Sequence, residues 1–150
     1  MSKRTPENHP RERKKEMRLT SSADGILYEF RALCLSLPET SERNSWGHPN
    51  FLAGQKTFAT FEQFHGRPSI AFRLGGSDSE RFAGNNQFFA TPYGRGQWLS
   101  LWVDTTFDWD LVKELAITSY RLVALKRMLV ALEARAEWHP KKTRVGRPNS

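Results

Sequence analysis

Only one cysteine occurs among the 150 residues, so the chain cannot form an internal disulfide or a cysteine-based metal site. The apolar runs are also short, and none reaches the roughly 18 residues that a membrane-spanning helix requires. The first 18 residues are polar and charged, without the apolar stretch of a signal peptide. We therefore expect a cytoplasmic protein that does not enter a membrane.

Residues suited to metal binding or catalysis are scarce. The four histidines show no ligand spacing such as H-x-x-x-H, and the acidic residues near the first predicted helix are too sparse for hard oxygen ligation. There is no G-x-S-x-G turn and no P-loop, and Cys34 falls on the apolar stripe of that helix. We expect no metal, no cofactor and no catalytic residues, so the chain is not predicted to be an enzyme.

The net charge of +7 comes from the two ends of the chain. Residues 1–20 hold seven basic and three acidic side chains, and residues 139–150 hold four basic side chains and no acidic one. Residues 21–138 therefore carry a net charge of −1. We expect 1–20 and 139–150 to be disordered basic tails, and 21–138 to form one domain without a broad positive surface.

Helices are predicted near both ends of this domain. Pro38 ends the first helix because it lacks an amide hydrogen, and the apolar positions of that helix are Ile26, Phe30, Leu33 and Leu37. Residues 78–84 predict a short helix opened by Ser77 or Asp78. Asp108 is expected to cap a third helix, and Ser119 a fourth that continues through Leu132.

From Phe51 to Leu74 the apolar period changes to two, which is typical of strands. Ala53-Gly54-Gln55 and His65-Gly66-Arg67 are turn sequences that divide this stretch into three antiparallel strands. Residues 88–90 and 98–104 predict a second strand pair. The sequence thus predicts an α+β two-layer sandwich, in which an antiparallel β meander is flanked by an N-terminal helix and C-terminal helices.

Several short motifs occur in a fixed order between about Ile26 and Lys126. They are Leu37-Pro38-Glu39-Thr40, Trp46-Gly47-His48-Pro49, Phe51, Lys56-Thr57-Phe58-Ala59, Pro92-Tyr93, Gly96-Gln97-Trp98 and Ser119-Tyr120. This ordered set resembles the MmcQ/YjbR family of small bacterial proteins. The resemblance implies an α+β sandwich similar to frataxin-like and double-wing DNA-binding folds, and with it a paired-wing mode of DNA binding.

The Trp46-Gly47-His48-Pro49 motif has two interpretations. In the functional one, Trp46 stacks on a base or ring, His48 forms a hydrogen bond or transfers a proton, and Tyr93 and Trp98 complete a candidate pocket. In the structural one, the motif is a turn that enters a strand, and Trp46 packs on the first helix. We expect the structural one, because no carboxylate or second histidine lies nearby in the sequence to orient His48.

Basic residues at predicted hairpin tips and in the C-terminal segment are candidate phosphate contacts. The last residues resemble an AT-hook through Gly146-Arg147-Pro148, although Val145 stands where such hooks carry a second arginine. The candidate nucleic-acid contacts are Arg67, Arg73, Arg95, Lys141, Lys142, Arg144 and Arg147.

Two functional hypotheses follow from these features. The first is a monomeric, non-catalytic module that binds DNA or another nucleic acid with little sequence preference, using hairpin tips and tails. The second is a small-molecule-binding or protein-binding domain with tails that only confer solubility. Its ligand would contact an aromatic sheet face formed by Trp46, Phe61, Tyr93, Trp98 and Trp102.

Overall fold

The computed structural model describes residues 23–92 and 96–138, so the predicted tails lie outside the described residues. The elements are α2 (Ala23–Leu35), β1 (Thr40–Ser45), β2 (His48–Ala53), β3 (Lys56–Phe64), β4 (Arg67–Arg73), α3 (Gly76–Glu80), β5 (Phe88–Ala90), β6 (Trp98–Trp102), α4 (Trp109–Val123) and α5 (Lys126–Trp138). The predicted α+β class is confirmed: an N-terminal helix and C-terminal helices pack on an antiparallel sheet.

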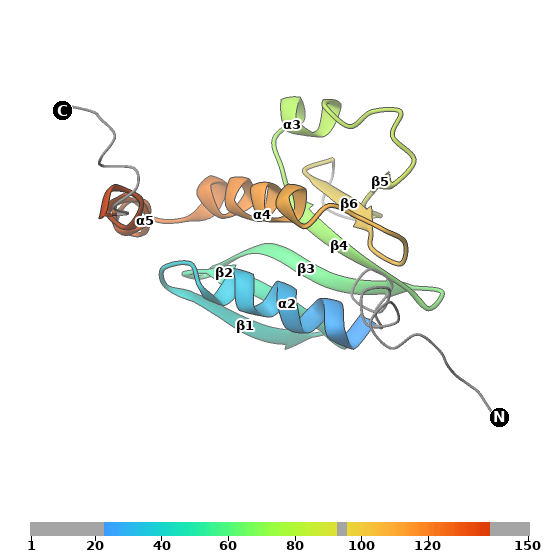
Figure 1. Ribbon diagram of the computed structural model, residues 1–150, viewed down its shortest axis with the longest axis horizontal. Coiled ribbons are helices and arrows are strands. Elements are labelled where there is room, and N and C mark those ends of the chain that lie inside the picture. The colour runs from blue at the N-terminus through green and yellow to red at the C-terminus, as the bar shows by residue number, and fades with distance from the viewer. Residues whose placement is uncertain (1–22, 93–95, 139–150) are drawn as a thin grey trace, which may run out of the picture.

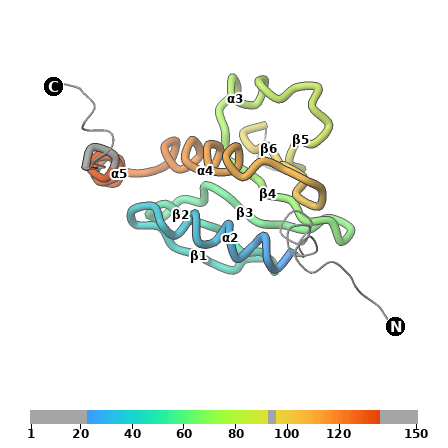
Figure 2. Tube along the Cα trace, in the orientation of Figure 1, coloured from blue at the N-terminus to red at the C-terminus, as the bar shows by residue number. Residues whose placement is uncertain are grey.

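Within the described residues, six strands form one sheet in the order β1-β2-β3-β4-β6-β5, and all neighbours are antiparallel. Figure 2 shows that β1 to β4 follow one another as hairpins before the chain leaves the sheet through α3. The chain then returns as β5 and β6, and β6 pairs with β4. Helix α2 contacts β1 and β2, and α4 contacts β3 and β4, so the two helices lie side by side over the sheet (Figure 1).

Apolar side chains alternate onto the face that these helices cover. Phe30 of α2 makes edge-to-face contacts with Phe51 and Phe72, at centroid distances of 5.4 and 6.1 Å. On β4, Ile70 and Phe72 belong to the hydrophobic core, whereas the equally buried Ser69 and Ala71 do not, which confirms the predicted strand period. One row of register partners on this face consists of Phe51, Ala59, Phe72 and Leu99.

Helix α4 begins where the sequence predicts it. Asp108 is the N-cap, and its carboxylate accepts a hydrogen bond of 2.9 Å from the backbone nitrogen of Asp110. The prediction that Ser119 caps a separate helix is wrong, because Ser119 is buried within α4. The helix instead ends at Ala124, whose backbone is extended, and α5 begins at Lys126.

An unpredicted strand and a shifted helix start also differ from the prediction. The sequence does not predict β1, because this edge strand is polar throughout. The strand contacts α2 through an ion pair of 2.6 Å between Glu42 and Arg31. Helix α3 begins after Gly75, which makes no side-chain capping bond, and not after Ser77 or Asp78. In both places the sheet and loop geometry determine the local structure without the residues that usually signal it.

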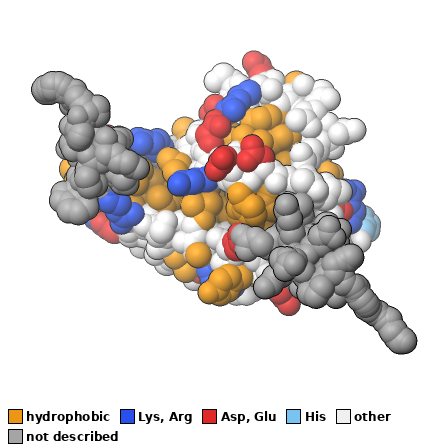
Figure 3. Space-filling model, in the orientation of Figure 1, with side chains coloured by type: hydrophobic (Ala, Val, Ile, Leu, Met, Phe, Trp, Pro, Cys, Tyr) orange, Lys and Arg blue, Asp and Glu red, His pale blue; other side chains and the backbone are white. Residues whose placement is uncertain are grey.

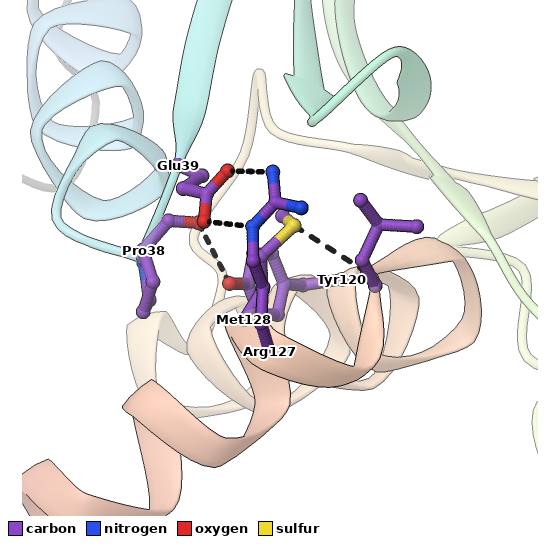
Figure 4. Close-up of polar contacts among 6 residues, drawn as sticks. Pro38, Glu39, Tyr120, Arg127 and Met128 are labelled. Carbon is purple, nitrogen blue, oxygen red and sulfur yellow. Dashed lines mark hydrogen bonds and ion pairs between the residues drawn. The ribbon is translucent and has the colours of Figure 1, made fainter.

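Helix α5 packs at one end of the sheet, where Figure 1 shows it end-on beside α4. The Tyr120 hydroxyl donates a hydrogen bond of 2.7 Å to the carbonyl oxygen of Pro38. Arg127 pairs with Glu39 through two hydrogen bonds of 2.6 and 2.7 Å (Figure 4), and Met128 is completely buried. The Tyr120 hydrogen bond thus attaches α4, and the Arg127 ion pair attaches α5, to the segment between α2 and β1.

Acidic and basic side chains adjoin one another on the helix-covered face (Figure 3). Arg81 pairs with Glu114 on this side of the molecule, and Arg121 pairs with Glu133 at 3.3 Å. The described residues include 11 Lys and Arg against 13 Asp and Glu, so they carry no excess of positive charge. No helix in the described part of the chain is long and apolar enough to cross a membrane.

Candidate ligand-binding groove on the open sheet face

The sheet face opposite α2 and α4 carries polar, small and aromatic side chains. Because neighbouring residues of a strand point to opposite faces, the register identifies the members of this face. One row across the strands consists of Arg43, Asn50, Thr60, Ala71 and Ser100, and the next consists of Glu62, Ser69 and Trp102. Ser69, Ala71 and Ser100 are completely buried, so a ligand would reach only the more exposed members of this face.

A groove of about 530 Å³ lies on this face beside the β1–β2 hairpin. Its volume falls within the range of ordinary small-molecule sites, about 300–1,000 Å³. Its described lining consists of Ser45, Trp46, His48, Asn50, Thr57, Thr60, Glu62, Phe64 and Trp98. Trp46, Phe64 and Trp98 supply aromatic rings, and Glu62 supplies a carboxylate. None of the described lining residues is lysine or arginine.

Trp46 forms the tip of the β1–β2 hairpin and lies 94% exposed at the groove. The expectation that it packs on the first helix is therefore wrong. Trp46 and Gly47 both adopt positive φ angles, 57° and 77°, as the two central residues of a type I′ turn do. The turn directs the indole away from the core, and Gly47 supplies the conformational freedom that the turn needs.

Hydrogen bonds fix the polar side of the groove. The hydroxyl of Thr60 donates a bond of 2.7 Å to Oδ1 of Asn50, and Nδ2 of Asn50 donates one of 3.0 Å to the backbone oxygen of His48. Thr60 is buried and Asn50 is half-buried, so water competes little for the Thr60–Asn50 bond. The amide orientation of Asn50 is thus fixed before any ligand enters.

An aromatic cluster borders the groove on the side of Phe64. Phe64 contacts Phe89 and Trp102 edge-to-face at 5.7 and 6.4 Å, and Phe89 stacks on Trp102 at 4.2 Å. The guanidinium of Arg67 lies 3.8 Å from the centroid of the Trp102 ring. It also pairs with Asp104 at 2.6 Å, and this ion pair lowers the pKa of the Asp104 carboxyl below its ordinary value.

Of the candidate phosphate contacts, the structure describes only Arg67 and Arg73, and both have partners within the protein. Arg67 is the first residue of β4, beside the His65-Gly66 tip, and its guanidinium is engaged by Asp104 and Trp102. Arg73 donates a hydrogen bond of 3.5 Å to Gln97. The remaining candidates lie outside the described residues: Arg95, Lys141, Lys142, Arg144 and Arg147.

The candidate pocket residues that the structure describes come together. Trp46, His48 and Trp98 line the same groove, although Trp98 follows His48 by 50 residues in the sequence. Tyr93 lies outside the described residues. Phe61, assigned above to an aromatic sheet face, is 3% exposed and packs in the core, so that assignment is wrong. Its register partner is Ile70, a residue of the helix-covered face.

Sequence reasoning missed most of the groove floor. Asn50, Thr57, Thr60, Glu62 and Phe64 line it, and none of them belongs to the predicted pocket. Polar residues at alternate positions of a long strand were an available signal, because such positions face away from the core. Glu62 is the clearest case, since it lies near the middle of the sheet and is only 6% exposed.

Metal and nucleophile chemistry finds little support in the described residues. No three His, Cys, Asp or Glu side chains among them are arranged to hold a metal ion. Cys34 is completely buried in α2, and burial raises the pKa of its thiol well above the ordinary value. A thiol in this state is a core residue and a poor nucleophile.

These features define a class: a small α+β domain with helices on one face of an antiparallel sheet and a groove on the other. The YjbR family model matches residues 35–122, and the chain belongs to this family. The predicted resemblance is thereby confirmed. Every described residue that lines the groove lies inside the matched region.

A solved structure is similar in fold. It is the Deinococcus radiodurans protein DR2400, with family-model domain DUF419, which is 18% identical and has a TM-score of 0.56 over 76% of this chain and 89% of that one. A protein from Pseudomonas syringae is 11% identical, with a TM-score of 0.49 over 57% of this chain and 87% of its own. No curated protein matches the chain.

Proposed function

We propose that this protein is a non-catalytic binding module whose open sheet face takes an aromatic or compact organic group in the groove. The observation that carries the proposal is the position of Trp46, an indole 94% exposed beside a groove of about 530 Å³. An aromatic residue of this size buries about 150–250 Å² when it is covered. At about 25 cal/mol per Å², covering it contributes roughly 4–6 kcal/mol before the costs of association are subtracted.

The conformation of Trp46 supports the same proposal. A bulky residue with positive φ is uncommon, and the first central position of a type I′ turn favours asparagine. The fold thus gains little from the packing of an indole at this position and nothing from its turn geometry. Local strain of this kind is typical of functional sites.

The polar floor supplies orientation. Thr60, Asn50 and the backbone of His48 form a fixed hydrogen-bonded chain along one side of the groove. Phe64 and Trp98 supply apolar surface elsewhere in the lining. A few placed polar groups beside aromatic walls are the usual composition of a small-ligand site.

The test is a fragment screen by two-dimensional NMR of the full chain, observed at the indole N–H signals of the five tryptophans. Compounds that bind the groove should shift the signals of Trp46 and Trp98, and Trp46→Ser should weaken their binding at least about tenfold. Tyr28→Ser is the matched control, because it removes another exposed aromatic side chain, 72% exposed on α2. Equal binding to the Trp46→Ser variant and to wild type would refute the proposal.

Nucleic-acid binding is a second candidate function, and the net charge of +4 in residues 139–150 favours it. The described arginines favour it less, because Asp104 already engages Arg67. We expect the salt dependence to weaken when the four basic side chains of residues 139–150 are replaced by glutamine: the negative slope of log K against log salt should decrease in magnitude by about 3–4. Arg67→Ala and Arg73→Ala in the full chain test the contribution of the sheet. An unchanged slope in the glutamine variant would contradict this candidate function.

A further inference from the structure

We propose that two copies of this chain associate through helix α5, as a symmetric and reversible dimer in which the two α5 helices lie antiparallel. The basis is an exposed apolar face on α5 that carries a lysine toward one end and a glutamate toward the other. The inference does not depend on the proposed function, because no described residue that lines the ligand-binding groove belongs to α4 or α5. It replaces the monomer that the sequence leads us to expect.

Large apolar side chains are exposed around α5. The described part of the chain exposes six large hydrophobic side chains, and each of the three that belong to this region is half exposed or more. They are Leu122 at the end of α4, Leu125 in the α4–α5 connection and Val130 on α5. Figure 1 shows α5 at one end of the molecule, beside α4. Burial of such surface is the dominant driving force of most associations between proteins.

The α5 face consists of residues at helical spacing. It is a shallow surface groove of about 420 Å³, and its described lining consists of Lys126, Leu129, Val130, Glu133 and Ala134. Steps of three and four residues connect these positions, so they lie on one side of the helix. Met128 belongs to another side, since it is completely buried in the core. Helix α5 thus has one apolar side packed on the domain and a second one at the surface.

The charges of the α5 face are self-complementary. Lys126 and Glu133 lie seven residues apart, which is about two helical turns, and the apolar Leu129 and Val130 lie midway between them. In an antiparallel pair with its two-fold axis at this midpoint, Lys126 of each copy lies opposite Glu133 of the other. The same axis brings the apolar side chains of the two copies together. A parallel pair would place like charges side by side, so the charges favour the antiparallel arrangement.

The present partner of Glu133 leaves room for this pairing. Both hydrogen bonds from Arg121 reach the same carboxylate oxygen of Glu133, Oε2, at 3.3 and 3.4 Å. Oε1 can therefore accept from a lysine of the second copy, and Lys126 forms no ion pair within the described residues. Arg121 also repels that lysine. The charges thus set the direction of the pairing, while the apolar side chains supply most of its affinity.

Two other arginines of α5 are directed toward the domain. Arg127 pairs with Glu39, and Arg135 donates a hydrogen bond of 2.5 Å to the backbone oxygen of Ser36. Glu39 and Ser36 both belong to the segment between α2 and β1, to which α5 is attached. These two arginines therefore do not oppose the approach of a second α5 face.

Residues 139–150 follow α5 directly and are the alternative occupant within the same chain. Apart from two prolines they contain one aliphatic side chain, Val145, and four of their side chains are basic. An apolar face with one charge of each sign is matched better by the same face of a second copy. We therefore favour the second copy as the occupant.

The expected dimer is weak because the interface is small. A helix of 13 residues is about 20 Å long, and two such helices bury less than the roughly 1,200 Å² of a stable interface. We expect a dissociation constant on the order of 10–100 μM.

The experiment is sedimentation equilibrium of the full chain between about 5 and 500 μM. The average mass should rise from 17.3 kDa, the mass of one chain, toward twice that value. Val130→Gln keeps a residue that favours helix but removes the exposed apolar side chain. It should weaken the dimer at least about tenfold, because a symmetric interface loses the side chain twice.

Charge reversal tests the antiparallel arrangement. Glu133→Lys should weaken the dimer at least about fivefold, and adding Lys126→Glu should restore at least about half of the wild-type affinity. The two positions are about 10 Å apart within one helix, so the restoration arises between copies. Glu114→Lys is the matched control, because it makes the same charge change on α4 and also removes an exposed ion pair with an arginine, Arg81.

The wild-type series decides the proposal without any variant, so a folding defect in one variant leaves the test intact. A mass that stays at 17.3 kDa up to about 500 μM would overturn the proposal and leave residues 139–150 or another protein as the occupant of the α5 face. Association that Val130→Gln leaves unchanged would mean that the copies meet through another surface, which also overturns it. Failure of the double variant to restore the dimer would exclude the antiparallel arrangement. None of these outcomes bears on the ligand-binding groove.

Discussion

Replacing Trp46 by asparagine is expected to stabilise the fold and to weaken ligand binding at the same time. The left-handed region costs most residues about 1–2 kcal/mol. Glycine is exempt from this cost, and asparagine adopts the region more readily than other side chains do. Trp46 has a φ angle of 57° at the position of a type I′ turn that asparagine favours. The substitution therefore removes strain from the hairpin tip.

Little packing is lost in return. Trp46 is 94% exposed, so the residue buries only a small part of its surface, which is worth about 0.3 kcal/mol. The net gain is then roughly 0.5–1 kcal/mol, and a chain of this size gains about 2–4 °C in Tm for each kcal/mol. Thermal unfolding of the full chain, followed by circular dichroism, should show a Tm that is higher by about 2 °C.

The second hairpin tip provides a matched control. His65 has a φ angle of 54° at the tip between β3 and β4, and it is exposed without lining the groove. His65→Asn should raise Tm by a similar or smaller amount and leave ligand binding unchanged. A Trp46→Asn variant that melts below wild type would refute the reasoning, because it would mean that Trp46 stabilises the free fold.

Three further predictions concern the framework around the groove. Tyr120→Phe leaves the carbonyl of Pro38 without its hydrogen bond of 2.7 Å and should lower the free energy of unfolding by about 1–2 kcal/mol in urea titrations, with an unchanged m-value. Phe72→Ala opens a cavity at a completely buried position and should cost about 3–5 kcal/mol; a cost below 1 kcal/mol would contradict the assigned core. The pKa of Asp104 is lowered by Arg67, so its contribution to stability is fully present above about pH 4 and is lost as the pH falls through the lowered pKa. Asp104→Asn should therefore flatten the pH dependence of Tm in the acid range, and an unchanged profile would show that this ion pair does not stabilise the fold.

The sequence predicts the core-facing elements well because local signals determine them. The alternation of Ile70, Phe72 and Leu74, the capping residue Asp108 and the Gly54 turn each report their structure within a few residues. Strand β1 has no such signal, since an edge strand can remain polar on both sides when a neighbouring strand supplies its hydrogen bonds. Strand β1 therefore lacks the alternation of apolar and polar residues by which strands are recognised in a sequence.

The groove is harder to predict because strand register determines it. Asn50, Thr60 and Trp98 become neighbours of one cavity only after β2, β3, β4 and β6 are aligned, and no local pattern specifies that alignment. The motif around Trp46 and His48 could be singled out because its aromatic and turn-forming residues are unusual together. Its indole was expected to pack on the first helix, because no carboxylate or second histidine nearby in the sequence favoured a functional role.

The attachment of α5 has a consequence for the order in which the protein opens. Arg127 of α5 pairs with Glu39, which lies 88 residues earlier in the chain. Besides exposed ion pairs, α5 contributes one fully buried side chain, Met128, and the half-buried Leu129 and Leu132. Few buried contacts give a low free energy of local unfolding. Amide hydrogens of α5 should therefore exchange with solvent well before those of β3 and β4, so the last helix detaches as a separate cooperative unit while the sheet and its groove stay folded.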